Sequence, residues 1–217
     1  MATFHHPPDE RLPSVEIAII AKAPIAGLAK TRLIPALGAA GAARLHRRLT
    51  LMTLACALDA KLGAVTVWCT PDSRHPFFRA LERTLGVHLQ VQPGGDLGAR
   101  MHTAARLHCV SGPVLIVGTD CPVLRPRHLR AAARALMAGN DAVFHPAEDG
   151  GYALIGLRAP QPALFEDMPW STASVMSETR ARARAQGLRI REFETLWDVD
   201  LPEQLERLDA LLPKAAP

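Results

Sequence analysis

The chain has 217 residues, 48% of them hydrophobic, which is enough for one well-filled core near the upper end of single-domain size. Its formal charge of +4 suits a phosphorylated small molecule, while an aromatic content of only 5% leaves few stacking surfaces and argues against nucleic acid as the partner. No run approaches the roughly 20 apolar residues of a membrane span, and the four cysteines lack C-x-x-C spacing; we expect no membrane partner and a cytoplasmic location.

Residues 1–14 lack the basic and apolar regions of a signal peptide. We predict that they form a disordered extension and that residues 15–212 form one domain. The first predicted strand covers 15–21, and the first helix covers 39–62, where Leu45, Leu49 and Met52 fall on one face. Gly63 is expected to end this helix.

Short apolar runs and amphipathic segments continue to alternate along the chain. Further strands are predicted over 65–69, 87–91, 114–117, 142–145, 152–157 and 188–193, and further helices over 76–85, 97–111, 126–138, 174–186 and from 202 onward. The alternation predicts a three-layer α/β fold with a mostly parallel sheet and right-handed crossovers. The strands 142–145 and 152–157 have no helix between them, so we expect an antiparallel element that makes the sheet mixed.

Carboxylates follow two of the predicted strands. Asp120 comes directly after the apolar run 114–117, at the carboxyl end of a central strand, where open α/β sheets bind ligands. Asp198 and Asp200 follow the last strand. Because one or two carboxylates together with substrate phosphates commonly hold Mg²⁺, Asp120 and one of the later pair predict a site for Mg²⁺ or Mn²⁺. The structural alternatives are a turn capped by Asp120 and a helix N-cap at Asp200.

The loop after the first strand is basic. It gathers three cations and a glycine at the expected binding edge: Lys22, Gly27, Lys30 and Arg32. Cations of this kind favour phosphate oxygens. The loop is not a P-loop, because Pro24 and Ala29 stand where that pattern needs glycine. The alternative is a surface loop with solvated charges.

Three further clusters are candidates for ligand contacts. In the turn 148–152, Asp149 could orient a hydroxylated substrate or act as a base, with Gly150 and Gly151 allowing close approach; a plain hairpin turn is the alternative. Asp96 and Arg100, at a loop-to-helix entry, could bind a phosphate or a base, or simply cap the helix. The segment Trp170, Ser171 and Thr172 could contact a sugar or base, or be a core tryptophan beside an N-cap.

Together these motifs resemble the small bacterial glycosyltransferase-like family described as radical-SAM/selenodomain-associated transferases, some of them assigned to arsenosugar biosynthesis. The resemblance rests on residues 21–33, 94–101, 118–124, 149–157, 170–172 and 198–205, in that order. It implies a Rossmann-like GT-A fold, that of nucleotide-diphospho-sugar transferases, and kinship with phospholactate guanylyltransferase and molybdenum-cofactor nucleotidyltransferases. It also implies that Asp120 and Asp200 hold the metal. The chain departs from the pattern at Leu201 and Gln204, and it lacks the first carboxylate of D-x-D.

The sequence thus predicts a metal-dependent glycosyltransferase that moves a sugar from a nucleoside diphosphate donor to a small acceptor. Lys22, Lys30 and Arg32 would hold the diphosphate, and Asp149 would orient the acceptor or take its proton. The alternative is a nucleotidyltransferase that moves a nucleotide from an NTP to a small phosphorylated or hydroxylated metabolite. A non-catalytic nucleotide-sensing domain is a third reading.

Overall fold

The computed structural model describes residues 14–211 and contains a seven-stranded sheet of order β3-β2-β1-β4-β6-β5-β7. The strands are β1 Glu16–Lys22, β2 Val65–Thr70, β3 His88–Val91, β4 Val114–Val117, β5 Ala142–Pro146, β6 Tyr152–Leu157 and β7 Ile190–Glu192. Only β6 runs antiparallel to its neighbours, β4 and β5. The predicted α/β class and the mostly parallel mixed sheet are therefore confirmed. The extension predicted over 1–14 falls, except for residue 14, outside the described residues.

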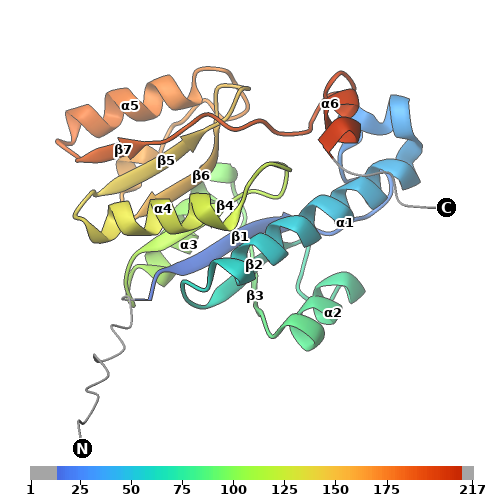
Figure 1. The fold of residues 1–217 in the computed structure, drawn as a ribbon, viewed down its shortest axis with the longest axis horizontal. Coiled ribbons are helices and arrows are strands. Elements are labelled where there is room, and N and C mark those ends of the chain that lie inside the picture. Colours follow the sequence, from blue (N-terminus) through green and yellow to red (C-terminus); the bar gives the residue numbers. More distant parts are fainter. Residues whose placement is uncertain (1–13, 212–217) are drawn as a thin grey trace, which may run out of the picture.

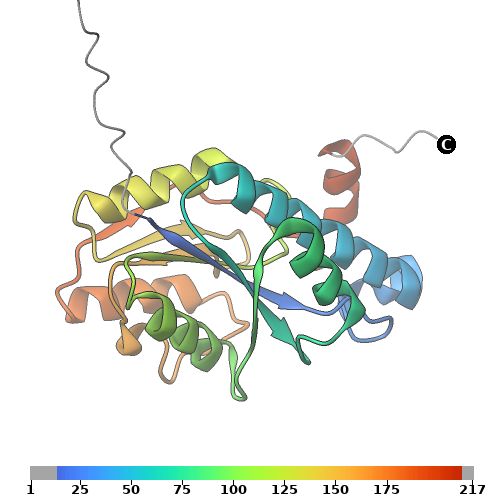
Figure 2. The ribbon, with the colours of Figure 1, turned by 90° about the horizontal axis from the view of Figure 1, so that it is seen from below.

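Helices cover both faces of the sheet (Figures 1 and 2). They are α1 Ile34–Ala60, α2 Pro76–Leu85, α3 Leu97–His108, α4 Pro126–Met137, α5 Val175–Ala185 and α6 Gln204–Leu211, with short 3₁₀ turns at Thr31–Leu33 and Pro162–Leu164. One core cluster joins α1, α2 and α4 to the sheet, and a second joins α3 and α5 to its other face. A third, smaller cluster packs α6 against the first half of α1. Within residues 14–211, no helix combines the length and the apolarity needed to cross a bilayer.

The central strands are apolar on both faces because both faces are covered. Leu115 and Val117 of β4 point into the cluster of α1, α2 and α4, whereas Val114 and Ile116 point into that of α3 and α5. Each of these side chains contributes on the order of 2 kcal/mol by leaving water. β4 pairs in parallel with β1, so the carboxyl ends of the two strands lie at the same edge of the sheet.

Several element boundaries differ from the prediction. α1 begins at Ile34, before the predicted start, and Gly38 breaks its helical geometry with φ 66°. The helix ends at Lys61, which takes the left-handed conformation expected of Gly63. Gly63 instead lies against the chain, since a Cβ there would be 2.8 Å from the carbonyl oxygen of Val15. β7 is shorter than predicted, and α6 begins at Gln204, after Pro202.

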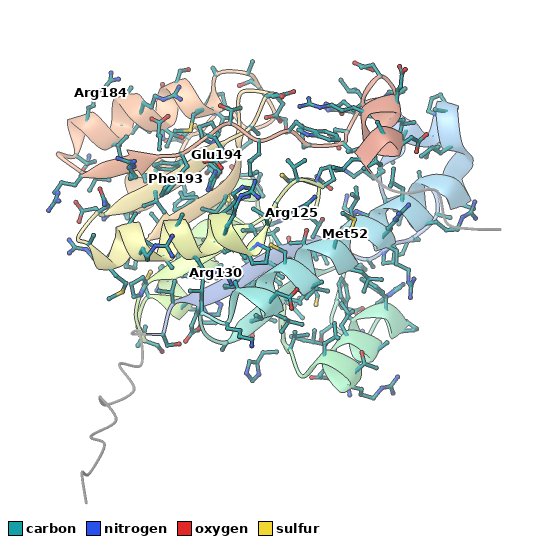
Figure 3. All side chains as sticks on the ribbon, in the orientation of Figure 1. Met52, Arg125, Arg130, Arg184, Phe193 and Glu194 are labelled. Carbon is teal, nitrogen blue, oxygen red and sulfur yellow. The ribbon has the colours of Figure 1, made fainter. Side chains whose placement is uncertain are left out.

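Contacts link α4 to α1, and contacts with β5 hold the chain that leads to Asp198 and Asp200. Arg130 lies on α4 (Figure 3). It donates to the carbonyl of Asp59 in α1. After β7, the ring of Phe193 stacks on His145, and His145 Nδ1 donates to the carbonyl of Glu194 at 3.0 Å. Burial lowers the pKa of His145, so this ring is neutral at pH 7. These contacts direct the following residues, 195–200, back across the sheet edge.

Candidate functional site

A cleft with a volume of about 480 Å³ opens at the carboxyl ends of β1 and β4. These neighbouring strands mark the point where the strand order reverses, which is where open α/β sheets bind ligands. Most of the residues predicted for the site line the cleft: Lys22, Lys30, Arg32, Arg100, Asp120, Asp149, Gly151, Trp170, Ser171, Thr172, Asp198 and Asp200. A smaller hollow of about 280 Å³ is lined by five of the same residues, among them Arg32 and Asp149.

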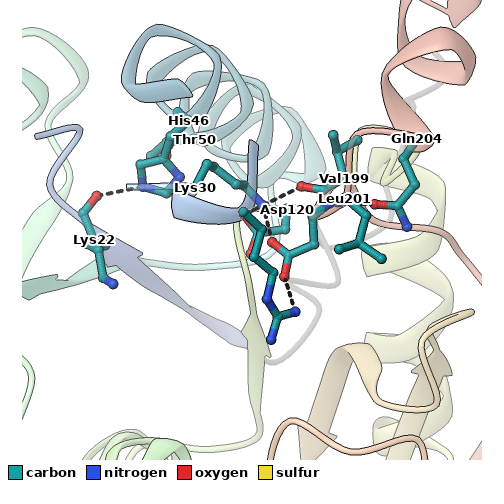
Figure 4. Close-up of polar contacts among 10 residues, drawn as sticks. Lys22, Lys30, His46, Thr50, Asp120, Val199, Leu201 and Gln204 are labelled. Atoms are coloured by element: carbon teal, nitrogen blue, oxygen red, sulfur yellow. Dashed lines mark hydrogen bonds and ion pairs between the residues drawn. The ribbon is translucent and has the colours of Figure 1, made fainter. Parts of the chain in front are cut away.

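Lys30 connects the two predicted carboxylates (Figure 4). Its Nζ lies 2.6 Å from Asp120 Oδ1 and 3.0 Å from Asp200 Oδ1, and it donates to the carbonyl of Val199 at 2.5 Å. Arg32 Nη1 reaches Asp200 Oδ2 at 3.3 Å. The structure thus brings Asp120 and Asp200 together, 80 positions apart in the sequence, but it places Lys30 between them rather than toward an open phosphate site.

The Lys30 side chain is only 3% exposed and keeps its charge through these contacts. Burial lowers the pKa of Lys30, but Asp120 and Asp200 outweigh that effect and hold the pKa above its ordinary value. Its backbone has φ 49°, and Ser171 across the cleft has φ 63°. Left-handed geometry at non-glycine residues costs about 1–2 kcal/mol each and is concentrated at functional sites.

Four carboxylates line the cleft, and two of them, Asp149 and Asp198, form no ion pair within residues 14–211. Burial, followed by the carboxylates of Asp149, Asp200 and Asp120, raises the pKa of Asp198 to about 6. Asp198 Oδ1 is also buried without a hydrogen-bond partner. Carboxylate oxygens are ligands that fit a hard divalent cation. Within residues 14–211 no group of three acidic, histidine or cysteine side chains could hold a metal, so water or substrate oxygens would have to complete the coordination of a cation held by two carboxylates.

Replacing Asp198 with Asn should stabilise the metal-free protein at pH 8 by about 1 kcal/mol, after allowing for the partial exposure of this side chain. The folded-state pKa of Asp198 lies above the unfolded value, so its ionisation opposes folding, and this penalty grows as the pH rises past 4 and is complete above about 6. Urea denaturation at pH 4 and pH 8 measures the effect. Equal stabilisation at both pH values would contradict the assignment.

Gln204 is one of the two positions at which the chain departs from the family pattern. Its Oε1 accepts the backbone N–H of Asp200 at 2.5 Å and that of Leu201 at 2.8 Å. The carboxylate of Asp200 stays free for Lys30 and Arg32, so the alternative of an N-cap at Asp200 is not what the structure contains. The side-chain amide of Gln204 therefore holds the turn that presents Asp200.

Three predicted site residues do not line the cleft. Asp96 caps α3, accepting the N–H of Ala99 at 2.8 Å, which is the structural alternative named above. Gly27 forms a turn with φ 82° and open space around it. Gly150 has φ 89° and approaches the backbone of Ala173, not the cleft. These three residues have local structural roles and do not line the cleft.

Two cleft residues escaped the sequence analysis. His46 Nε2 donates to the carbonyl of Lys22 at 2.8 Å, and burial lowers the pKa of His46. Its position within α1 gave no signal. Gln92 donates to the carbonyls of Ala21 and Trp68 and accepts from Arg100 Nη1 at 3.3 Å, so it orients Arg100. Its place just after β3, at the same sheet edge as Asp120, is a signal that could have found it.

Two aromatic side chains, Tyr152 and Trp170, line the cleft. Tyr152 and Trp170 meet edge to face, with ring centroids 6.4 Å apart. Trp170 lies close against α3, since a Cβ on Gly98 would be 2.7 Å from Trp170 Nε1. Tyr152 Oη, Trp170 Nε1 and Arg100 Nε are all buried without a partner in the described residues. Because buried polar groups are normally paired, these donors favour a polar ligand.

Comparison with protein families identifies the chain. A family model described as "Uncharacterized protein conserved in bacteria (DUF2064)" matches residues 53–172, more than half of the sequence. The chain belongs to this family. The match covers the strand that presents Asp120 and the segment through Thr172. A comparison with curated proteins found no match.

Several solved structures share the fold of this chain. A protein from Desulfovibrio desulfuricans G20, provisionally assigned as a nucleotide-diphospho-sugar transferase, is 28% identical with a TM-score of 0.80, covering 90% of this chain and 87% of its own. CMP:2-keto-3-deoxy-manno-octonic acid synthetase, complexed with CTP, is 15% identical with a TM-score of 0.60, covering 91% and 98%. The corresponding values for 4-diphosphocytidyl-2C-methyl-D-erythritol synthase from Anaerococcus prevotii are 13%, 0.60, 95% and 100%. The fold is Rossmann-like, and the 28% identical structure supports an enzyme with transferase activity.

Proposed function

We propose that this protein is a metal-dependent glycosyltransferase that moves a sugar from a nucleoside diphosphate donor to a small acceptor. The observation that carries the proposal is the cleft itself, which sets Asp120 and Asp200 beside the cations of the basic loop at the switch point of the sheet. The 28% identity to a protein provisionally assigned as a nucleotide-diphospho-sugar transferase supports the same class. The association with arsenosugar biosynthesis remains part of the resemblance alone.

In this proposal Asp120 and Asp200 hold Mg²⁺ or Mn²⁺, which when bound would stabilise the negative charge that gathers on the departing diphosphate. Lys22 and Arg32 line the same cleft and bind the phosphate oxygens. Gln92 holds Arg100 toward the donor. The acceptor occupies the smaller hollow beside Arg32.

Asp149 lines both the cleft and the smaller hollow, so it lies where donor and acceptor would meet. Its Oδ1 accepts the N–H of Gly151 at 2.8 Å, which fixes the carboxylate on the hairpin. We assign to it the orientation of the acceptor hydroxyl and the removal of its proton as the acceptor oxygen bonds to the sugar. Closure by Trp170 and Tyr152 would exclude water from the reacting bond.

A second candidate is nucleotidyl transfer from an NTP to a small phosphorylated or hydroxylated metabolite. One observation favours it: β4 is followed by a single carboxylate, Asp120, and the second carboxylate comes from the segment after β7. The CTP complex among the structural neighbours is consistent with this alternative. The cleft would then hold a triphosphate in place of a diphosphate sugar.

The deciding experiment incubates the purified protein with a panel of sugar nucleotides and NTPs in the presence of Mg²⁺ or Mn²⁺. Release of a nucleoside diphosphate from a sugar nucleotide supports glycosyl transfer, and release of pyrophosphate from an NTP supports nucleotidyl transfer. Tight binding with no turnover of any donor in the presence of an acceptor panel would instead identify a nucleotide-sensing domain. Liquid chromatography of the nucleotide products distinguishes the three results.

A further inference from the structure

Lys30 occupies the space that a cation would take between Asp120 and Asp200 (Figure 4). Its ammonium group donates to Asp200 Oδ1 at 3.0 Å and to the carbonyl of Val199 at 2.5 Å, and it forms an ion pair with Asp120 Oδ1 at 2.6 Å. The Lys30 side chain is almost fully buried. While these three contacts persist, the ammonium group of Lys30 is engaged by the carboxylates and not by a phosphate.

We infer that the Lys30 ammonium and a divalent cation compete for Asp120 and Asp200, so that the cation binds only as Lys30 leaves. The inference rests on the proposed function in one respect, namely that these two carboxylates are the cation ligands. It assigns Lys30 two alternative partners, the carboxylates before cation binding and an anionic ligand afterwards. Lys30 is thus a positioning residue that couples cation entry to phosphate binding.

The charges of the cleft favour this exchange. Lys30 contributes a single positive charge, while Asp149 and Asp198 line the same cleft and make no ion pair within residues 14–211. A divalent cation adds a second positive charge to the same cluster, which lowers the repulsion among the four carboxylates. The displaced ammonium stays in the basic loop with Lys22 and Arg32. An arriving phosphate therefore pairs with the Lys30 ammonium that the carboxylates have released.

Two features of the loop that carries Lys30 are consistent with a second backbone conformation. Lys30 is held at φ 49°, a strained value that moving away from the carboxylates could relieve. Gly27, three residues earlier, has φ 82° with nothing within 4 Å of the position that a Cβ would take, so a turn there can change without a steric clash. The strained residue and the unobstructed turn lie on the same connection between β1 and α1.

The test is a titration with Mn²⁺ alone, without nucleotide, in which electron paramagnetic resonance counts the free ion. Lys30→Met removes the competing ammonium and should tighten Mn²⁺ binding by about tenfold or more. Lys22→Met is the matched control, because it removes the same charge from the same cleft without touching Asp120 or Asp200. It should change the affinity by no more than about threefold. An affinity of Lys30→Met equal to or weaker than wild type overturns the inference.

A measurement on the unaltered protein does not depend on how the variant folds. Acetylation of Lys30 by a small amine-reactive acetyl donor such as acetic anhydride, followed by mass spectrometry, should be slow without metal because the amine is buried and paired. Saturating Mn²⁺ should raise its rate by about tenfold, while the rate at the exposed Lys22 serves as an internal reference. An unchanged Lys30 rate overturns the exchange. Turnover of a donor in the panel experiment would still support the proposed function in that case. Failure of the exchange at Lys30 and failure of the proposed function are therefore distinguishable.

Discussion

Replacing Asp120 with Asn should reduce turnover by about 10²–10³-fold and remove the metal-dependent part of nucleotide binding. Asn keeps the shape of the side chain but loses the charge that attracts a divalent cation. The fold should survive, because the Asp120 side chain is 44% exposed and Lys30 retains Asp200 and the carbonyl of Val199. We expect the free energy of unfolding to change by no more than about 1 kcal/mol. Calorimetry with nucleotide and Mg²⁺, and urea denaturation, measure the two quantities.

Asp96→Asn is the matched control for this change. Asp96 was also predicted to contact the ligand, but its carboxylate caps α3. Asn is as good an N-cap as Asp, so this variant should keep both the stability and the nucleotide affinity of the wild type. Unchanged metal-dependent affinity in Asp120→Asn, or an equal loss in Asp96→Asn, would show that the Asp120 charge is not the specific requirement.

The elements of the fold were predictable because their signals are local. The helix over 76–85 and the strands over 114–117 and 152–157 have the predicted bounds, since each is marked by its own periodicity and flanked by Gly or Pro. Gly38 and Lys61 show where this fails. Gly38 lies just before the predicted start of the helix, so the helical turn that precedes it was missed, and a lysine took the left-handed cap because Gly63 was needed for close packing.

The edge of the sheet that holds the site was also predictable, because residues at the carboxyl ends of parallel strands must meet. The pairing of side chains within the site was not. Lys30 could be assigned to phosphate from its neighbours in the loop, but its actual partners, Asp120 and Asp200, are 90 and 170 positions away. Which of several carboxylates a buried ammonium contacts depends on loop geometry that no local pattern encodes. His46 was missed for the same reason.

The largest effect on stability is expected from Gly150→Ala, at about 3 kcal/mol or more. Gly150 has φ 89°, which a side chain rarely adopts, and its Cβ would lie 2.2 Å from the carbonyl oxygen of Ala173. Its own carbonyl accepts the N–H of Met176 at 2.8 Å, so the contact ties the β5–β6 hairpin to the start of α5. Because backbone atoms meet on both sides, no rotamer change can relieve the clash. Urea denaturation measures the loss.

Gly151→Ala separates this packing argument from a general sensitivity of the hairpin. The three heavy atoms nearest to a Cβ on Gly151 all belong to the Asp149 carboxylate, with Oδ1 at 3.2 Å, and the φ of Gly151 is not in the left-handed region. That variant should lose less than about 1 kcal/mol of stability. Its activity should nevertheless fall if Asp149 handles the acceptor, because the added methyl group displaces this carboxylate. Gly150→Ala within about 1 kcal/mol of wild type would contradict the packing role, whereas equal losses in both variants would place the constraint in the hairpin as a whole.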